Sequence, residues 1–496
     1  PARRLLTVGL KIEAGPRSQV VSVEFEGLRS FPEEELRPLL NLSPGSIFSW
    51  PALYEDRTVL MNRYRSAGFK DVRIETRAEP VEGGPNYQVK IIIDEGPVYS
   101  ISQVEVQGTR RTRSSFVLRE SGLKTGEPVS LEKLAQAQKN LYDSGIFQSV
   151  NIQSLPESPD SHQEKVQIQL RERPWLSLTY GLQYNTDTKF EGFGQIDFNN
   201  IFGSGWNSLL YFRANQRQQD ARATLQIPYL FSWKADSLLS AFYLKDIKDL
   251  FITEQLGISF QQRIRVVRGF DLSWMYRFSR IHDYEREPSW PFPYDIRITS
   301  SELSMLLNRD TRDDKFDPKK GFMLSSTFSY SPRFLGSDLN YLRSFTQFTM
   351  YKSLLQGVIW ASGYRLGLST AFGESLIYSK RFFAGGGTSI RGFKLDAVGP
   401  LDIWTGLPEG GEAMLVVNQE LRFPIYKILR GVAFLDVGNV YSHLSDFNPL
   451  KLRTGAGLGL RIESPLGLIR IDYGFNLKPR PGEPKGALFF SLGQAF

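Results

Sequence analysis

The chain has 496 residues, of which 41% are hydrophobic and 23% charged, a balance that is typical of folded proteins and excludes a disordered chain. Cysteine is absent, which excludes disulfide bonds, thiolate nucleophiles and cysteine-based zinc sites, and the three histidines (His162, His282 and His443) lie far apart in no metal-ligand spacing. No apolar run reaches the roughly 18 residues of a membrane-spanning helix, so we expect no helical span.

The net charge of +7 is distributed in a way that argues against a nucleic-acid partner. Residues 1–174 hold 23 Lys and Arg against 23 Asp and Glu, so every excess positive charge falls in residues 175–496. There the charges are scattered and form no stripe of the kind that follows a phosphate backbone. We therefore expect no nucleic acid among the partners, and interpret these charges as solvated or as lining a lumen.

The first third of the chain contains an internal repeat with a period of roughly 80 residues. The matching pairs are SVEFEG (22–27) with QVEVQG (103–108), NRYRSAGFKDVRI (62–74) with KNLYDSGIFQSVNI (139–152), and VKIIIDEGP (89–97) with VQIQLRERP (166–174). Each copy predicts a strand, a Gly turn, two amphipathic helical stretches, a Gly-Phe turn and two closing strands. We therefore expect small α+β modules over residues 19–98 and 99–174.

The opening residues also match this repeat. VGLKIEAGP (8–16) aligns with VKIIIDEGP (89–97), the closing strand of a module. We expect residues 1–18 to be the C-terminal remnant of a preceding module. The alternative is a short N-terminal arm with accidental similarity.

From Trp175 onward the sequence alternates with a period of two residues. Between 176 and 184, Leu and Tyr alternate with Ser, Thr, Gly and Gln, and between 469 and 475, Ile, Tyr and Phe alternate with Arg470, Asp472 and Gly474. Such strands fit a soluble sandwich, whose apolar face meets a second sheet, or a membrane barrel, whose apolar face meets lipid.

The number of such segments favours the barrel. They lie near 176–185, 190–200, 206–217, 220–228, 236–246, 252–262, 269–281, 296–308, 321–331, 340–352, 358–372, 413–424, 430–440, 453–463, 467–476 and 486–496. An even number of strands of about ten residues is typical of transmembrane barrels, as is an abundance of aromatic residues (35 Phe, 21 Tyr and 8 Trp). The sequence predicts α+β modules followed by a 16-stranded antiparallel transmembrane β-barrel over residues 175–496.

The longest stretch without a strand pattern, residues 373–412, contains RFFAGGGTSIRGF (381–393). A phosphate-binding loop, a flexible linker and a loop folded tightly against another part of the protein are the three interpretations. The first fails because the Gly-Lys-Ser/Thr ending and the following helix are missing. If the first strand rises from the side of the modules, residues 373–412 form the sixth external loop. The aspartate-rich turn 308–321 then lies on the module side, between strands 8 and 9. It lacks the central Gly and terminal Glu of a calcium loop, so we expect a capped turn.

These features in this order resemble the BamA/TamA family of outer-membrane protein assembly factors, which combine POTRA modules with a 16-stranded barrel. FFAGGGTSIRGF (382–393) resembles the loop-six signature of the family, and NQELRFP (418–424) and AFLDVGNV (433–440) resemble the two strand motifs that receive the arginine of that loop. The resemblance covers essentially the whole chain. It assigns to the loop-six motif Gly385, Gly386, Ser389, Ile390, Arg391, Gly392 and Phe393, and to a C-terminal strand signal Phe490 and Phe496.

The resemblance makes Glu420 and Asp436 the expected lumen partners of Arg391. Alternation along the strands agrees, because Glu420 alternates with Leu421 and Asp436 with Leu435, which places both carboxylates on the inward face. A buried guanidinium needs such an anionic, bidentate partner. Glycines would let the loop pass close to the inner wall with positive φ.

The resemblance implies a function without catalysis, cofactor or ATP: insertion of outer-membrane proteins of a Gram-negative bacterium. Modules in the periplasm would capture client strands by β-augmentation, and the seam between strands 1 and 16, around Gln183 and Phe489, would open toward the lipid. The expected partners are the outer-membrane bilayer, unfolded client proteins, and periplasmic chaperones or accessory assembly proteins.

Three alternatives remain open. A polypeptide-secretion translocator of the same superfamily usually has two modules and a plug helix, so residues 8–16 favour the insertion factor. A barrel that anchors a lipolytic domain would need that domain upstream, because no Gly-x-Ser-x-Gly occurs in the chain. A passive porin would need neither repeat modules nor this loop.

Overall fold

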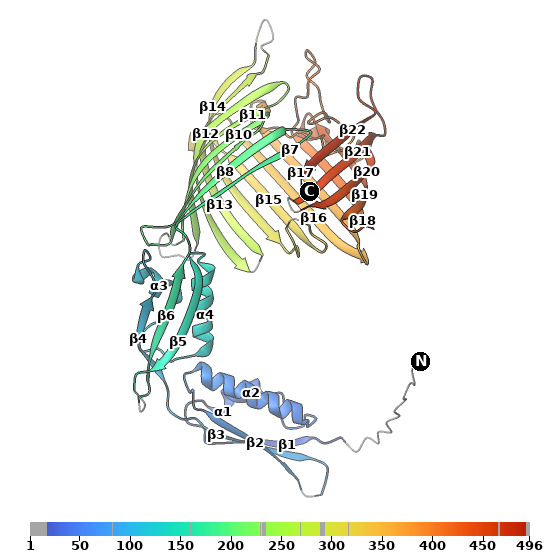
Figure 1. Ribbon diagram of the computed structural model, residues 1–496. Coiled ribbons are helices and arrows are strands. Elements are labelled where there is room, and N and C mark those ends of the chain that lie inside the picture. The colour runs from blue at the N-terminus through green and yellow to red at the C-terminus, as the bar shows by residue number, and fades with distance from the viewer. Residues whose placement is uncertain are drawn as a thin grey trace. The chain divides into compact units, whose positions relative to one another are not determined.

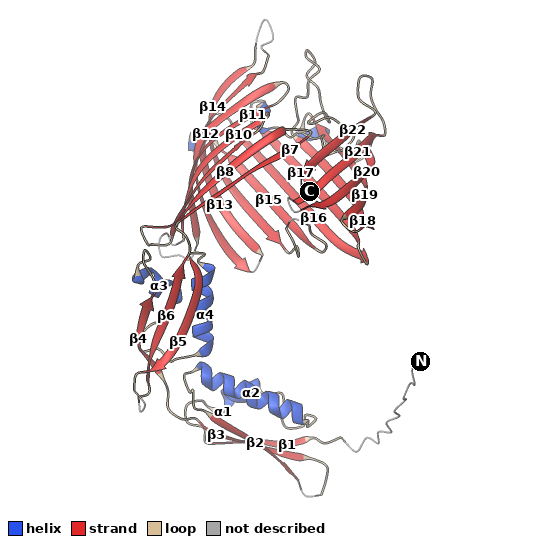
Figure 2. Ribbon diagram, viewed as in Figure 1, coloured by secondary structure: helices blue, strands red, loops and turns tan. Residues whose placement is uncertain are grey.

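The computed structural model describes residues 17–81, 83–158, 161–228, 230, 235–267, 269–287, 293–315, 317–464 and 467–492. One compact unit holds the residues up to Arg173, and the other holds nearly all of the rest (Figures 1 and 2). Residues 1–16, which carry most of the expected remnant, and Phe496 lie outside the described residues.

The first module is a three-stranded sheet covered by helices. Its elements are β1 (Val20–Glu26), α1 (Glu33–Leu36), the 3₁₀ turn η1 (Arg37–Leu39), α2 (Trp50–Ser66), β2 (Arg73–Pro80) and β3 (Tyr87–Asp94). The strand order is β1-β3-β2, with β1 parallel and β2 antiparallel to β3. The first predicted helical stretch is short because Pro38, which has no backbone N–H, lies two residues after the end of α1.

Helix α2 begins where Ser49 accepts a hydrogen bond from the backbone N–H of Ala52 through its side chain. Its buried residues Leu53, Leu60 and Tyr64 recur at helical spacing and pack in one cluster with the alternating Val89, Ile91 and Ile93 of β3. A 3.6-residue period on the helix and a period of two on the strand thus create a single core between them.

The second module repeats this plan. Its elements are β4 (Ser100–Gln107), α3 (Ser114–Ser121), α4 (Leu131–Asp143), β5 (Phe147–Pro156) and β6 (Gln163–Glu172). The order β4-β6-β5 and the strand directions match those of the first module. The predicted order of elements is therefore confirmed in both copies.

Each module carries one equivalent carboxylate that caps the loop after its first strand. Glu95 accepts hydrogen bonds from the backbone N–H groups of Arg29 (2.8 Å) and Ser30 (3.0 Å), from the Ser30 hydroxyl (2.6 Å) and from the Tyr64 hydroxyl (3.0 Å). Glu172, which aligns with Glu95 in the repeat, binds the backbone and hydroxyl of Thr112 in the same way. Burial alone would raise the pKa of Glu95, but these hydrogen bonds outweigh it and the pKa lies below its ordinary value.

We predict that this cap makes the module sensitive to acid. A carboxylate whose pKa is lower in the folded than in the unfolded state stabilises the fold above the unfolded pKa of about 4.3, and this stabilisation is lost as the pH falls toward the folded pKa. Glu95→Gln should lower the free energy of unfolding at pH 7 by about 1–3 kcal/mol and lose less on acidification. Urea denaturation at pH 7 and pH 3.5, with the exposed Glu79→Gln as control, measures this. Equal pH dependence in the native protein and Glu95→Gln would contradict it.

Sixteen strands of the described chain form one closed antiparallel barrel, as predicted. They are β7 (Leu176–Asn185), β8 (Lys189–Ile201), β9 (Trp206–Ala214), β10 (Gln218–Ile227), β11 (Asp236–Ile247), β12 (Phe251–Val267), β13 (Phe270–Glu285), β14 (Asp295–Asp310), β15 (Gly321–Ser331), β16 (Tyr341–Leu355), β17 (Val358–Ala371), β18 (Ala413–Tyr426), β19 (Leu429–Tyr441), β20 (Arg453–Ser464), β21 (Gly467–Asn476) and β22 (Gly486–Leu492). The largest differences from the sequence are in β12 and β13, which extend several residues further because their pairing continues to Val267 and Glu285.

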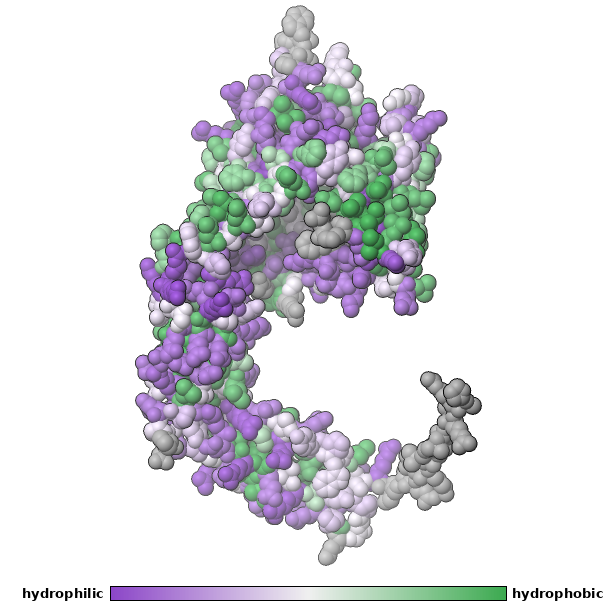
Figure 3. Space-filling view, viewed as in Figure 1, coloured by the Kyte–Doolittle hydropathy of each residue, from purple (hydrophilic) through white to green (hydrophobic). Residues whose placement is uncertain are grey.

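The two faces of the barrel wall differ as the alternation predicts. Leu178, Tyr180 and Leu182 of β7 point outward and are 63%, 78% and 85% exposed, whereas Gln255 and Ser279 are buried inside and hydrogen-bonded to each other. Hydrophobic side chains gather on the outer wall, with hydrophilic ones above and below (Figure 3). Among the described residues, no helix is both long and apolar enough to cross a membrane.

The turn 308–321 joins β14 to β15, the eighth and ninth barrel strands. The Asp313 carboxylate accepts hydrogen bonds from the backbone N–H groups of Asp314, Lys319 and Lys320, and Asp310 binds Arg312. Asp310 and Asp313 therefore bind the backbone and side chains of the turn itself, as in a capped turn.

Pairing at the seam between the first and last barrel strands is described only as far as Leu492, because residues 493–496 lie outside the described residues. Within the described residues, β22 and β7 have one register pair, Ser491 with Asn185, whereas β7 and β8 pair over ten. The Thr186 N–H donates to the Phe490 carbonyl (3.1 Å), and the Phe490 N–H donates to the Thr186 hydroxyl (3.3 Å). Gln183 and Phe489, expected to lie across the seam, are therefore not opposite each other.

Candidate functional site

The loop between β17 and β18, residues 372–412, approaches the barrel wall so closely that only glycine fits at the contacts. Gly385, Gly386 and Gly392 have φ values of 116°, 93° and 98°, a region that L-residues with side chains rarely adopt. On the wall, a Cβ on Gly455 would lie 1.8 Å from the Arg391 carbonyl oxygen, and one on Gly474 would lie 2.5 Å from the Gly392 nitrogen. The glycines of the loop and of β20 and β21 therefore allow backbone to pack on backbone.

Arg391 lies at the centre of this contact and is 1% exposed. Its Nε and Nη2 donate to the two carboxylate oxygens of Asp436 on β19, at 2.7 and 2.8 Å, and its backbone N–H donates to the same carboxylate at 3.1 Å. Its Nη1 donates to Glu420 on β18 (2.6 Å). The structure thus brings together Arg391 and both partners expected from the sequence, in the bidentate geometry that guanidinium and carboxylate favour.

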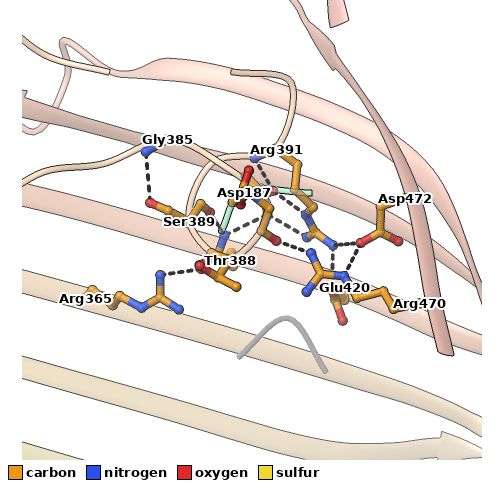
Figure 4. A network of polar contacts seen from close by, with 12 residues as sticks. Asp187, Arg365, Gly385, Thr388, Ser389, Arg391, Glu420, Arg470 and Asp472 are labelled. Atoms are coloured by element: carbon orange, nitrogen blue, oxygen red, sulfur yellow. Dashed lines mark hydrogen bonds and ion pairs between the residues drawn. The ribbon is translucent and has the colours of Figure 1, made fainter. Parts of the chain in front are cut away.

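Further charged side chains of the wall extend the network (Figure 4). Asp472 of β21 lies 3.3 Å from Nη1 of Arg391 and binds Arg461 of β20 at 2.5 Å and Arg470 of β21 at 2.7 Å. Arg422 of β18 binds Glu420 at 2.9 Å. Alternation had placed Asp472 and Arg470 on one strand face, but nothing in the sequence linked them to Arg391. Arg461 was not identified at all.

This network is buried without being apolar. Four arginines face three carboxylates, and each of the seven side chains is at most 4% exposed. The Arg391 guanidinium also lies over the Phe434 ring, 3.5 Å from its centroid. Removing one member leaves a buried charge uncompensated, so the network fixes the position of the loop more firmly than exposed ion pairs would.

The other loop residues expected from the sequence pack around this centre. The Ser389 hydroxyl accepts a hydrogen bond from the Gly385 N–H (3.2 Å), and its carbonyl accepts one from Asn418 of β18 (2.6 Å). Ile390 and Phe393 are 0% and 2% exposed and belong to an apolar cluster with wall residues such as Val416.

The loop is also attached to the opposite wall, which the sequence did not predict. Lys248, in the turn between β11 and β12, binds Asp396 of the loop at 2.9 Å. On β13, the Asp283 carboxylate accepts a hydrogen bond from the Ser379 N–H at 3.0 Å. Phe490, assigned to the C-terminal strand signal, lies apart from the loop network, at the seam beside Tyr184.

The arrangement can hold a loop against the barrel wall. In the described part of the chain, no group of three or more His, Asp or Glu side chains is placed to bind a metal. The carboxylates around Arg391 are neutralised by arginines and lie away from solvent, so none is positioned as a general acid or base.

Comparison with known proteins gives both parts a family. The Omp85 superfamily domain matches residues 200–496, and the POTRA family, described as a surface antigen variable number repeat, matches residues 19–96 and 99–173. The chain is 26% identical to the outer membrane protein assembly factor BamA of Nitratidesulfovibrio vulgaris, over 99% of this chain and 64% of that protein. It is 20% identical to the protein of the same name from Neisseria meningitidis serogroup B, over 99% of this chain and 68% of that protein.

The crystal structure of BamA from Haemophilus ducreyi lacking POTRA domains 1-3 has the same fold. It superimposes with a TM-score of 0.74 at 19% identity, over 96% of this chain and 99% of that one. The chain spans 64% of the length of the Nitratidesulfovibrio vulgaris relative.

Proposed function

The chain belongs to the Omp85 superfamily, and from this premise we propose that it inserts β-barrel proteins into the outer membrane. It is an outer-membrane protein whose POTRA modules lie in the periplasm. Its relatives are named assembly factors and not enzymes, which agrees with a site that holds a loop in place. Clients would be unfolded outer-membrane proteins, delivered with or without accessory proteins.

The seam between β7 and β22, as far as the described residues show it, is the observation that carries this proposal. A strand edge that faces lipid leaves backbone N–H and C=O groups without partners, which is costly in a bilayer. An incoming client strand can satisfy those groups by pairing with β7 or β22. A barrel with one described register pair between its ends is therefore suited to open at that place.

The pinned loop would keep one side of the seam rigid. Arg391 is bound to residues of β18, β19 and β21, which are the strands leading to β22. We infer that these strands and the loop move as one body, while the β7–β8 hairpin separates from them. Opening would then need no change in the buried charge network.

Reconstitution tests this function. The protein is placed in lipid vesicles, an unfolded outer-membrane protein is added in urea, and its insertion is followed by protection from protease and by heat-modifiable migration. We expect insertion to be much faster than in empty vesicles. A client that reaches the vesicle interior without entering the membrane would instead indicate a secretion translocator.

We also predict that the modules contribute through strand capture. The edge strands of the described modules are β1 and β2 in the first and β4 and β5 in the second. The N-terminal ends of β1 and β4 are already hydrogen-bonded to residues 45–48 and 126–129. Since main-chain hydrogen bonds dominate such capture, deleting residues 17–98 should slow insertion severalfold while the barrel stays folded. The same vesicle assay measures this, with heat modifiability as the check on folding. Undiminished insertion would mean that the first module is a spacer.

A further inference from the structure

The two peptide groups that flank the α-carbon of Gly387, at the tip of the loop, are held from two sides. The Gly387 N–H donates to the Asp187 carboxylate at 2.8 Å, and the Gly387 carbonyl accepts a hydrogen bond from the Arg470 guanidinium. Arg470 in turn binds Asp472 of the network around Arg391. The tip is thus tied both to the buried network and to a residue outside it.

The two groups that hold Gly387 lie on opposite sides of the seam. Asp187 is in the turn between β7 and β8, the first two barrel strands, and Arg470 is on β21, which pairs with the last strand, β22. Gly387 therefore bridges the seam from inside the barrel through its N–H and its carbonyl, in addition to the backbone bonds described between the two ends of the barrel.

Local structure aims Asp187 at the loop. The Asn185 side chain accepts hydrogen bonds from the backbone N–H groups of Asp187 (3.0 Å) and Thr188 (2.7 Å) and donates to the Thr188 hydroxyl (2.6 Å), which fixes the turn. A Cβ on Gly387 would lie 2.9 Å from the Phe489 ring and 3.2 Å from the Asp187 carboxylate, so the tip approaches both sides as closely as a glycine can.

Beside this close contact, packing at the seam is incomplete. A cavity of about 250 Å³ lies between the β7–β8 turn, the loop tip and the end of β22. Its wall includes Asp187, Thr388, Phe489 and Ser491. Because side chains do not fill this space, the hydrogen bond between Asp187 and Gly387 contributes a larger share of the stability of the closed seam than it would in a packed interface.

We propose that Asp187 is a latch: by accepting the Gly387 N–H, it holds the β7–β8 hairpin against the pinned loop and keeps the seam closed. The proposal rests on the proposed function only in taking the seam as the opening through which clients pass. Asp187 is a positioning residue and contacts no client. Opening the seam requires the Asp187–Gly387 bond to break, whereas the Arg391 network stays intact.

Hydrogen exchange of the Thr186 amide tests the latch directly. This N–H is bonded across the seam to Phe490, so its exchange in the native state reports how often the seam opens. In the full chain in detergent micelles, Asp187→Ala should raise the Thr186 exchange rate by about tenfold, near the lower limit for a hydrogen bond to a charged acceptor. Asp187→Asn, which keeps an oxygen acceptor, should raise it much less.

Two controls separate a latch from general destabilisation. Asp197→Ala removes a carboxylate of the same hairpin that binds Gln195, and should leave the exchange of Thr186 unchanged. Exchange in β16 and β17 should be unchanged in every variant. A uniform rise over the barrel, no rise at Thr186 in Asp187→Ala, or equal rises in the Asn and Ala variants would each overturn the latch.

The outcome does not depend on client insertion. A disulfide between β7 and β22 would lock the seam. If Asp187→Ala raises the exchange rate of the Thr186 amide but such a disulfide leaves client insertion intact, the latch stands and the proposed function fails. If the exchange is unchanged and locking the seam stops insertion, the latch fails and the proposed function stands.

Discussion

Arg391→Ala is expected to destabilise the barrel by about 3–5 kcal/mol, the usual cost of removing one partner of a buried ion pair. Asp436 loses its arginine partner in this variant, whereas Glu420 remains paired with Arg422, and Asp472 remains paired with Arg461 and Arg470. The site is 1% exposed, so solvent does little to reduce the effect. Heat-modifiable migration and the temperature of barrel unfolding measure it.

Arg391→Lys should recover only part of this stability. One ammonium group cannot reproduce the two parallel bonds to Asp436 together with the bond to Glu420. Equal stability of Arg391→Lys and the native protein would mean that charge alone matters and the fork geometry does not.

A double-mutant cycle isolates the pair from its surroundings. Arg391→Ala and Asp436→Ala should have a coupling energy of about 2 kcal/mol or more, because the two side chains share two charge-assisted hydrogen bonds. The control cycle pairs Arg391→Ala with Asp283→Ala, which binds a different part of the same loop and should be nearly additive. A coupling near zero between Arg391 and Asp436 would show that the loop is not fixed by this pair.

Much of the architecture could be predicted because it depends on local patterns. The barrel strands follow from alternation, since every second side chain faces lipid or lumen, although β12 and β13 extend beyond the predicted ends. The modules follow from the repeat, which also aligns Glu95 with Glu172. The partners of Arg391 were found because two strand motifs resemble those of a known family and because Glu420 and Asp436 face inward.

The remaining features depend on contacts between distant segments that no local pattern records. Asp187 and Gly387 are 200 positions apart, and Lys248 and Asp396 are 148 apart. The register of the seam is set by no hairpin turn, because β7 and β22 are the two ends of the barrel, which is why Gln183 and Phe489 were wrongly placed opposite each other. Likewise, the parallel pairs β1–β3 and β4–β6 join strands that are distant in the sequence, so no local pattern predicts them.

The second large effect is expected from locking the seam. Continuing the register of Asn185 and Ser491 by one pair places Tyr184 opposite Leu492, on the lipid face. Cysteines at these two positions leave the side chain of Asn185, which shapes the latch turn, untouched. The chain has no native cysteine, so the only disulfide that can form within it joins the seam.

The control pair is Phe348→Cys with Tyr364→Cys, which joins neighbouring strands β16 and β17 far along the chain from the seam. It introduces the same chemistry into the barrel wall without closing an opening. Its insertion rate should equal that of the native protein, both oxidised and reduced.

Client insertion by the oxidised and reduced Tyr184→Cys/Leu492→Cys protein, measured in the same vesicles, tests the central claim most directly. The disulfide fixes β7 against β22, so a client strand cannot reach either edge. We predict that insertion falls at least about tenfold in the oxidised protein, a barrier increase of about 1.4 kcal/mol or more, and returns to the native rate on reduction. Full insertion activity with a quantitatively formed disulfide would contradict insertion through the seam.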